Sequence, residues 1–285
     1  MQFVTAGGAT LPALGFGTYG MARPDMLRMI PSALKAGFRH IDTAQIYRNE
    51  AEVGECVAAS GLRREDVFLT TKVWVANYPE RAFTRSVDDS LRKLRTDYID
   101  LLLLHWPSEA VPLAEQIAGL NTAVQAGKVR HIGVSNFNST LMAEAVKLST
   151  APIITNQFEY HPYLNQKVLI DACRRLGVSV TAYCGMAVGR VFGEPILKDI
   201  AAAHGKTVAQ LVLRWLLQQD GVIALSRSTN PKRIASNMQV LDFTLSPAEM
   251  ASIHDLARDG SRIVDPPGLA PHWDTTSNAT IATAA

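Results

Sequence analysis

The feature that most constrains the fold is a regular alternation of short apolar runs with longer amphipathic stretches along the 285 residues. Apolar runs of this length are typical of strands buried on both faces of a parallel sheet. Eight such runs are present, and their last residues are Gly17, Thr43, Val73, His105, Asn136, Tyr160, Tyr183 and Ser226. The stretches between them have helical periodicity: in residues 80–94, one face holds Phe83, Val87, Leu91 and Leu94.

Length alone allows about two domains or one large barrel. Eight strand-then-helix units without a linker favour an α/β fold, a closed (β/α)8 TIM barrel, as a single domain over residues 1–285. Residues 4–14, with a central glycine pair, predict an N-terminal β-hairpin at one barrel mouth. A capping box at residues 246–249 predicts an extra C-terminal helix, followed by an irregular segment from residue 259 and a loose tail over residues 275–285.

Composition excludes several classes of partner. Lys and Arg number 28 against 26 Asp and Glu, so no strong positive field attracts nucleic acid or an acidic membrane. Cys56, Cys173 and Cys184 are widely spaced and odd in number, which favours a reducing compartment and indicates neither disulfides nor a cysteine metal site. Because neither a signal peptide nor an apolar run of about 20 residues is present, we expect a cytoplasmic protein.

Polar side chains close three of the apolar runs, and one more follows in a loop. Asp42, Lys72 and His105 stand at or next to strand ends, and Tyr47 lies in the loop after the second strand. Functional groups of such barrels lie at the carboxyl ends of the strands. We therefore expect these four side chains to meet in one mouth of the barrel.

Together the four residue types suit proton transfer to a carbonyl oxygen. A tyrosine hydroxyl ordinarily titrates near about 10, and a close ammonium such as that of Lys72 would lower the pKa of the phenol. Asp42 would hold Lys72 charged in a buried setting. His105 could orient the carbonyl oxygen or share the proton. This set would protonate the oxygen while another group attacks the carbon.

Each of the four residues also has an ordinary explanation. Asp42 could be a helix cap, Lys72 a surface lysine, Tyr47 a packing residue and His105 a structural histidine. Only their joint placement at strand ends favours a functional site.

Residues 15–20, Gly-Phe-Gly-Thr-Tyr-Gly, match the G-x-G-x-x-G motif of Rossmann folds, with Asp42 about 20 residues beyond the motif. Pro24 and Asp25 place the first helix after the motif, so Gly20 would not pack within that helix. We therefore prefer the barrel.

Three motifs carry a resemblance to a known family. Residues 37–50 read Gly-Phe-Arg-His-Ile-Asp-Thr-Ala-Gln-Ile-Tyr-Arg-Asn-Glu, residues 132–137 read Ile-Gly-Val-Ser-Asn-Phe, and the third motif covers residues 225–237. They resemble the signatures of the aldo-keto reductases, and the likeness extends from the hairpin to about Asp274. The short loops and residues 262–274 are most similar to the bacterial 2,5-diketo-D-gluconate reductase subgroup.

The resemblance implies a catalytic tetrad of Asp42, Tyr47, Lys72 and His105, with Tyr47 as the general acid. It implies NADPH or NADP+ as cofactor, preferred over NADH, and no metal. The implied cofactor contacts are Gly17, Thr18, Asp42, Ser135, Asn136, Gln157, Tyr183, Cys184, Gly185, Arg227, Ser228, Thr229, Arg233 and Asn237. The implied substrate pocket consists of Tyr19, Trp74, Trp106 and Trp273. Arg227 stands where many members have a lysine, and Cys184-Gly-Met replaces their Ser-Pro-Leu.

The predicted activity is NADPH-dependent reduction of aldehydes or ketones to alcohols, including keto sugars or keto acids such as 2,5-diketo-D-gluconate, or small dicarbonyls. We expect a monomer that acts on a small carbonyl substrate. Two alternatives remain: a Schiff-base lyase that uses Lys72 as its amine, and a non-catalytic NADPH-binding sensor or partner subunit.

Overall fold

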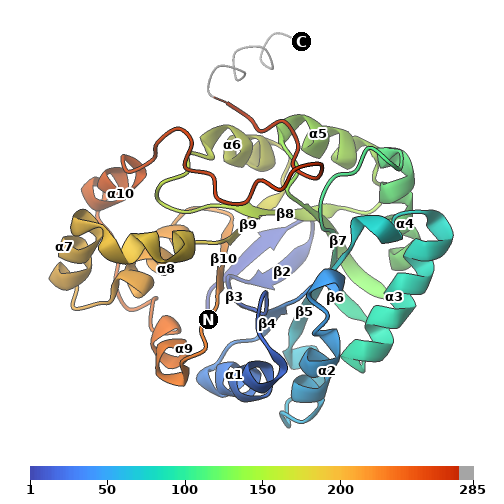
Figure 1. Ribbon diagram of the computed structural model, residues 1–285, viewed down its shortest axis with the longest axis horizontal. Coiled ribbons are helices and arrows are strands. Elements are labelled where there is room, and N and C mark those ends of the chain that lie inside the picture. Colours follow the sequence, from blue (N-terminus) through green and yellow to red (C-terminus); the bar gives the residue numbers. More distant parts are fainter. Residues whose placement is uncertain (276–285) are drawn as a thin grey trace.

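The computed structural model describes residues 1–275, and eight parallel strands close into a barrel ringed by helices (Figure 1). The barrel strands are β3 (Leu14–Gly17), β4 (His40–Asp42), β5 (Phe68–Val73), β6 (Ile99–Leu104), β7 (Val129–Ser135), β8 (Ile153–Glu159), β9 (Ser179–Tyr183) and β10 (Val222–Ser226). Each pairs with the next along the chain, and β10 pairs with β3. The predicted TIM barrel is confirmed, and every strand ends at the predicted residue or one before it.

The helices follow the strands, and the predicted helix over residues 80–94 is observed as α3. The α-helices are α1 (Arg23–Ala36), α2 (Glu50–Ala58), α3 (Glu80–Leu94), α4 (Leu113–Gln125), α5 (Ser139–Leu148), α6 (Lys167–Arg175), α7 (Pro195–Ala203), α8 (Val208–Leu217), α9 (Pro231–Asn237) and α10 (Pro247–His254). Four short 3-10 segments are η1 (Gln45–Tyr47), η2 (Arg64–Asp66), η3 (Val75–Asn77) and η4 (Ala187–Gly193). Three of the four residues predicted on the inner face of α3 are buried, namely Phe83, Val87 and Leu94. Leu91 is half-buried and packs against the core.

An antiparallel hairpin of β1 (Phe3–Ala6) and β2 (Ala9–Pro12) precedes the barrel, as expected. Its turn uses Gly7 and Gly8, both with positive φ, a backbone conformation that glycine adopts without strain. A Cβ at Gly7 would lie 2.8 Å from Pro152, just before β8, so the hairpin sits at the amino ends of the strands. In Figure 1 it lies behind the barrel, which leaves the opposite mouth open for a site.

The turn of residues 15–20 does not form a Rossmann motif. Gly20 has a positive φ of 66° in a turn, and α1 begins only at Arg23, with Pro24 in its first turn. The glycine-rich segment therefore connects a barrel strand to its helix.

The register between β7 and β8 fixes two polar residues at the open mouth. Their pairing has an irregularity between Ile132 and Val134, after which Ser135 stands opposite Gln157. A Cβ at Gly133 would lie 2.6 Å from the Thr155 carbonyl oxygen, so only glycine allows the strands to approach this closely. The local sequence thereby places Ser135 and Gln157 side by side.

After the last helix the chain runs along one side of the open mouth, beside the end of β8 and the start of α5 (Figure 1). The predicted capping box starts α10: the Ser246 Oγ accepts from the Glu249 backbone N–H, and the Glu249 carboxylate accepts from the Ser246 N–H. Residues 259–275, which we call the C-terminal segment, have no helix or strand, as expected. The predicted loose tail lies outside the described residues except for Thr275.

Membrane-spanning helices, metal sites and disulfides were each considered in residues 1–275. None of the helices in residues 1–275 is long and apolar enough to cross a membrane. Within the same residues, no group of three or more His, Cys, Asp or Glu side chains is placed to hold a metal ion. The three cysteines are free thiols.

Candidate active site

The four residues predicted from strand ends lie together at the open mouth. The Lys72 Nζ donates to the Asp42 Oδ1 at 2.5 Å and lies 5.1 Å from the centre of the Tyr47 ring. The Tyr47 ring stands edge-on to the His105 ring, with centres 5.6 Å apart. Because β4, β5 and β6 are neighbours, residues 30 or more positions apart in the chain meet here.

The Lys72–Asp42 ion pair is buried, and each partner makes one further hydrogen bond. Lys72 is 0% exposed and also donates to the Thr43 carbonyl oxygen at 2.9 Å. The second Asp42 oxygen accepts from the Gln157 Nε2 at 2.8 Å. Burial lowers the pKa of Lys72, and Asp42 opposes this effect by attracting the ammonium. Lys72 is therefore not the surface lysine of the ordinary explanation.

The direction of the Tyr47 pKa differs from the expectation. Burial raises the pKa of Tyr47 well above its usual value, and the negative charge of Asp42 raises it further. The expected lowering of the Tyr47 pKa by Lys72 is not found, because burial, the larger effect, and the Asp42 charge both raise the pKa. The Tyr47 phenol consequently keeps its proton at neutral pH, as a proton donor must.

His105 is neutral in this environment. Its side chain is buried, and burial together with the positive charge of Lys72 holds its pKa well below the usual value. Its backbone N–H donates to the Val73 carbonyl, which fixes the residue at the end of β6. A neutral imidazole donates one N–H and accepts at the other nitrogen, so His105 can orient a carbonyl oxygen but carries no imidazolium proton to give.

This depressed pKa predicts acid sensitivity. The unfolded chain protonates its histidines near about pH 6.5, whereas folded His105 stays neutral to lower pH. The unfolded state therefore binds more protons in this window, and stability is lost as pH falls below about 6.5, at up to about 1.4 kcal/mol per pH unit for one group. We expect His105→Gln to reduce the drop in the unfolding midpoint between about pH 7.5 and about pH 5.5, measured by circular dichroism. Equal drops in both proteins would contradict a buried neutral His105; His40, whose pKa burial also lowers, remains in both.

Four of the predicted cofactor residues form one hydrogen-bonded network beside the tetrad. The Tyr183 hydroxyl donates to the Asn136 Oδ1 at 2.7 Å, and the Asn136 Nδ2 donates to the His105 carbonyl at 3.0 Å. The Ser135 Oγ donates to the Gln157 backbone carbonyl at 2.8 Å. Asn136 has a φ of 62°, an uncommon conformation outside glycine that is frequent at functional sites. These amide and hydroxyl groups are thus held in fixed orientations next to His105.

The remaining predicted cofactor residues lie along the neighbouring strand ends. Thr18, after Gly17, is buried and donates through its hydroxyl to the Asp42 carbonyl at 3.0 Å. At the end of β9, Cys184 has a φ of 59°, Gly185 is buried, and burial raises the pKa of the Cys184 thiol to about 11. The thiol is therefore protonated and a poor nucleophile.

Two arginines stand exposed at the end of β10 and the start of α9. Arg227 donates to the Gly20 carbonyl at 3.1 Å, and no carboxylate of the described residues lies within ion-pair distance of Arg227 or Arg233. Ser228 and Thr229 lie between them, and the Asn237 Nδ2 donates to the Ser226 Oγ at 2.9 Å. This group offers a phosphate two guanidinium cations that have no carboxylate partner.

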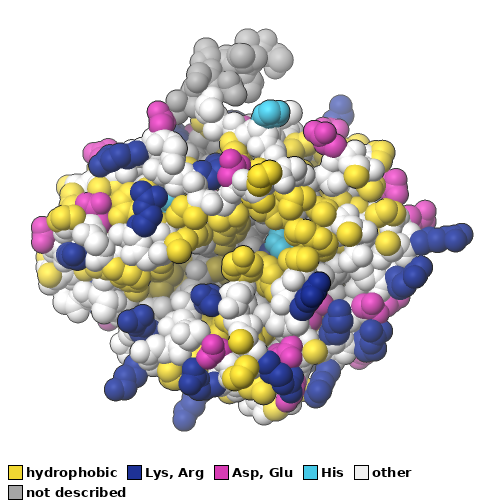
Figure 2. Space-filling model, in the orientation of Figure 1, with side chains coloured by type: hydrophobic (Ala, Val, Ile, Leu, Met, Phe, Trp, Pro, Cys, Tyr) yellow, Lys and Arg dark blue, Asp and Glu magenta, His cyan; other side chains and the backbone are white. Residues whose placement is uncertain are grey.

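Two of the predicted pocket aromatics contact the tetrad, and the other two contact each other. Tyr19 contacts Tyr47 with ring centres 5.1 Å apart, and Trp74 contacts His105 at 5.4 Å. Trp106 contacts Trp273 of the C-terminal segment at 6.4 Å. Figure 2 shows hydrophobic side chains around the centre of this face, with a histidine among them. The mouth is therefore walled by rings, with the polar tetrad inside.

Sequence reasoning missed the residues that hold the C-terminal segment over the mouth. Glu159 closes β8, and its two oxygens accept the Ile263 and Val264 backbone N–H groups at 2.8 Å each. Asp274 accepts from both the Ser139 N–H and the Ser139 hydroxyl. The strand-end rule that selected Asp42 would also have selected Glu159, since both close an apolar run.

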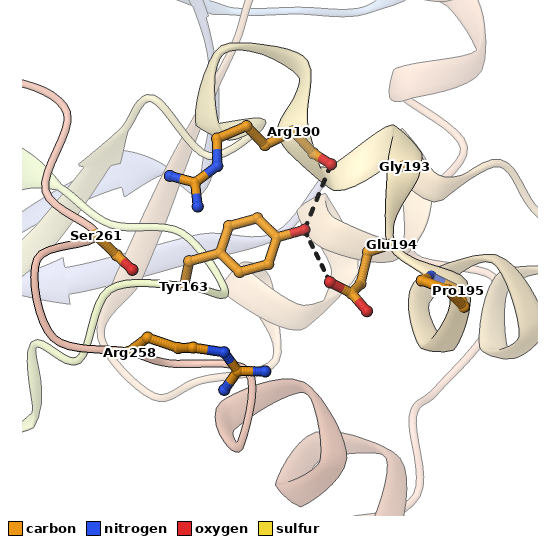
Figure 3. Close-up of a pocket in the computed structure, with 7 residues that line it drawn as sticks. All are labelled: Tyr163, Arg190, Gly193, Glu194, Pro195, Arg258 and Ser261. Atoms are coloured by element: carbon orange, nitrogen blue, oxygen red, sulfur yellow. Dashed lines mark hydrogen bonds between the residues drawn. The ribbon is translucent and has the colours of Figure 1, made fainter.

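A separate cavity of about 400 Å³ lies where η4, the start of α7 and residues 258–261 meet (Figure 3). The Tyr163 hydroxyl there donates to the Arg190 carbonyl or the Glu194 carboxylate, each at 3.4 Å. Its lining residues are Tyr163, Arg190, Gly193, Glu194, Pro195, Arg258 and Ser261. None of them was a predicted site residue.

Comparisons of sequence and of structure both find that the chain is similar to aldo-keto reductases. A sequence model of the Aldo/keto reductase family matches residues 13–258. Methylglyoxal reductase DkgB of Yersinia pestis is 40% identical over 268 residues, covering 93% of this chain and all of that protein. A crystal structure whose protein carries the provisional name 2,5-diketo-D-gluconic acid reductase B has a TM-score of 0.95 and 58% identity, covering 96% of this chain and 98% of its own. The Bombyx mori aldo-keto reductase in complex with NADP has a TM-score of 0.84 and 33% identity, covering 90% and 92%.

Proposed function

This chain belongs to the aldo/keto reductase family, and from that premise we propose that it reduces aldehydes or ketones to alcohols with NADPH. The observation that carries the proposal is the arrangement at the open mouth: a protonated Tyr47 and a neutral His105 beside the buried Lys72–Asp42 pair. These groups can donate a proton and orient an oxygen, and they include no hydride source. A dihydronicotinamide supplies the hydride when bound.

The residues present fit that cofactor. The network of Ser135, Asn136 and Gln157 offers amide and hydroxyl groups for a carboxamide beside His105, and the half-buried Tyr183 ring offers a stacking face. The unpaired Arg227 and Arg233, with Ser228 and Thr229 between them, would hold a 2′-phosphate. Asn237 would contact the adenine, and the Gly17-Thr18 and Cys184-Gly185 strand ends would border the cofactor. Free guanidinium groups favour NADPH over NADH.

Tyr47 acts as the general acid in this proposal. When the carbonyl carbon accepts hydride, its oxygen becomes an alkoxide, a far stronger base than a phenolate, so even a phenol of raised pKa gives up its proton. The Lys72 ammonium lies 5.1 Å from the centre of the Tyr47 ring, so its attraction for the phenolate offsets part of the unfavourable effects of burial and of Asp42. Asp42 keeps Lys72 charged, and His105 orients the carbonyl oxygen.

We propose small dicarbonyls or keto sugar acids as substrates, since relatives are named for methylglyoxal and for 2,5-diketo-D-gluconic acid. The aromatic wall of Tyr19, Trp74, Trp106 and Trp273 accepts small carbonyl compounds of varied shape. We further propose that the chain acts as a monomer and that residues 1–285 form one domain.

The test is NADPH oxidation, followed at the nicotinamide absorbance, with aldehydes, dicarbonyls and keto sugars. We expect turnover with several of them. Binding of NADPH without any turnover would contradict a reductase and favour a sensor. The Schiff-base alternative needs an accessible amine, whereas Lys72 is buried and bonded to Asp42 and Thr43. Borohydride trapping of a carbonyl compound on Lys72 would support this alternative.

Arg233→Ala is expected to weaken NADPH binding by about tenfold or more while NADH binding changes little, because only NADPH carries the phosphate. Dissociation constants of both cofactors from fluorescence titration provide the measurement. Lys232→Ala is the matched control, since Lys232 is an exposed cation next to Arg233 on α9. Equal losses for the two cofactors would show that Arg233 does not bind the 2′-phosphate.

A further inference from the structure

Arg262 is a cation whose donors are not used by the described residues. It lies in the C-terminal segment, and its guanidinium carbon stands 3.7 Å above the centre of the Trp273 ring. No described residue accepts a hydrogen bond from the guanidinium, and its Nη1 is buried without a partner. Burial lowers the pKa of Arg262, but the guanidinium stays charged at neutral pH. Stacking on Trp273 fixes the guanidinium plane, and the Nε and Nη2 atoms, unlike Nη1, are not enclosed and can receive a ligand.

Carboxylates face Arg262, but none forms an ion pair with it. Glu159, Asp265 and Asp274 act on it electrostatically. Their hydrogen bonds go elsewhere: Glu159 binds the Ile263 and Val264 N–H groups and His161, Asp265 accepts from the Trp273 Nε1 at 2.8 Å, and Asp274 binds Ser139. These hydrogen bonds fix the C-terminal segment in place. None of the three carboxylates accepts a hydrogen bond from the Arg262 guanidinium.

The position of Arg262 places this fork on the wall of the open mouth. Its stacking partner Trp273 contacts Trp106, and Trp106 directly follows His105 in the chain. Arg262 also acts electrostatically on Tyr183, whose hydroxyl binds Asn136 in the network beside His105. A molecule seated between the tetrad and the C-terminal segment therefore has a guanidinium on one side and the proton donor on the other.

We propose that Arg262 binds the carboxylate of anionic carbonyl substrates, so that oxo acids are reduced in preference to neutral carbonyl compounds of the same size. A guanidinium fork pairs with a carboxylate through two parallel hydrogen bonds, which none of the neutral groups at the mouth can do. This inference rests on the proposed reduction of carbonyl compounds. It selects keto acids over neutral dicarbonyls within that substrate range.

The test compares 4-oxobutanoate with its methyl ester, which has the same reacting aldehyde and lacks the charge. Wild type is expected to favour the acid in kcat/KM. Arg262→Gln is expected to lower kcat/KM for the acid by about tenfold or more, chiefly through KM, and to lower it much less for the ester. Arg262→Lys keeps the charge without the fork and should recover part of the loss. Equal losses for acid and ester, or no loss for the acid, would overturn the proposal.

Arg258→Gln is the matched control, because Arg258 is an exposed arginine four residues earlier that lines the cavity of Figure 3. It should alter neither substrate's kinetics. A second readout needs neither turnover nor a variant: quenching of tryptophan fluorescence by benzoate and by benzamide in the presence of NADP+. Tighter binding of benzoate supports the carboxylate site even if no carbonyl is reduced, so failure of the proposed reaction is distinguished from failure of the site. Binding of benzoate no tighter than benzamide overturns the inference.

Discussion

Replacing Tyr47 by phenylalanine is expected to lower kcat for carbonyl reduction by about 100-fold to 10,000-fold, the usual contribution of a positioned general acid. The phenol holds its proton because burial raises its pKa, and it lies next to both His105 and Lys72. His105 is neutral and offers no replacement proton. Removing one hydroxyl leaves the ring contacts in place, so the dissociation constant of NADPH should change little. Stopped-flow single turnovers and fluorescence titration measure the two quantities separately.

Tyr19→Phe is the matched control for this prediction. Tyr19 also presents a phenol at the mouth and contacts the Tyr47 ring, but it is 70% exposed and lies outside the tetrad. Loss of the Tyr19 hydroxyl should change kcat only slightly. If Tyr47→Phe kept its activity while His105→Gln lost it, the proton would come from elsewhere and the proposed role of Tyr47 would be wrong.

The second large effect concerns stability. Lys72→Met is expected to lower the free energy of unfolding by about 3–5 kcal/mol, because it leaves the Asp42 carboxylate buried without its cation. Gln157 alone would remain as a side-chain donor to Asp42. The double variant Asp42→Asn with Lys72→Met removes both charges and should recover most of the loss. Urea unfolding of the wild type and of the two variants at neutral pH provides the comparison.

An exposed ion pair serves as the control. Lys167 and Asp171 form a helical pair at 2.6 Å on α6, with the lysine side chain 76% exposed. Lys167→Met should cost less than about 1 kcal/mol, the usual value for surface pairs. A Lys72→Met protein as stable as this control would show that Asp42 is not charged in the fold.

The barrel could be predicted because burial on both faces imposes continuous apolar runs, and these runs end where the strands end. Three of the four tetrad positions followed from the same rule, since Asp42, Lys72 and His105 are polar residues at or next to the ends of apolar runs. Tyr47 was selected because it lies in the loop that follows Asp42. The turn glycines Gly7 and Gly8 and the capping box of α10 were likewise local signals.

Other features depend on distances that a linear sequence does not contain. The direction of the Tyr47 pKa is set first by burial of the phenol, and the extent of this burial appears only in the fold. The irregular C-terminal segment has no periodicity, so its path could not be predicted. Its attachment to Glu159 joins residues 104 and 105 positions apart.

This segment has a consequence for how such an enzyme can change. Residues 259–275 belong to none of the eight repeated units, yet they supply Arg262 and Trp273 to the wall of the mouth and are tied down at Glu159 and Ser139. Insertions, deletions or grafts between those two tethers would reshape what the enzyme accepts without moving a barrel strand. Natural selection or protein engineering could therefore change the range of substrates while the residues that carry out the reaction stay the same.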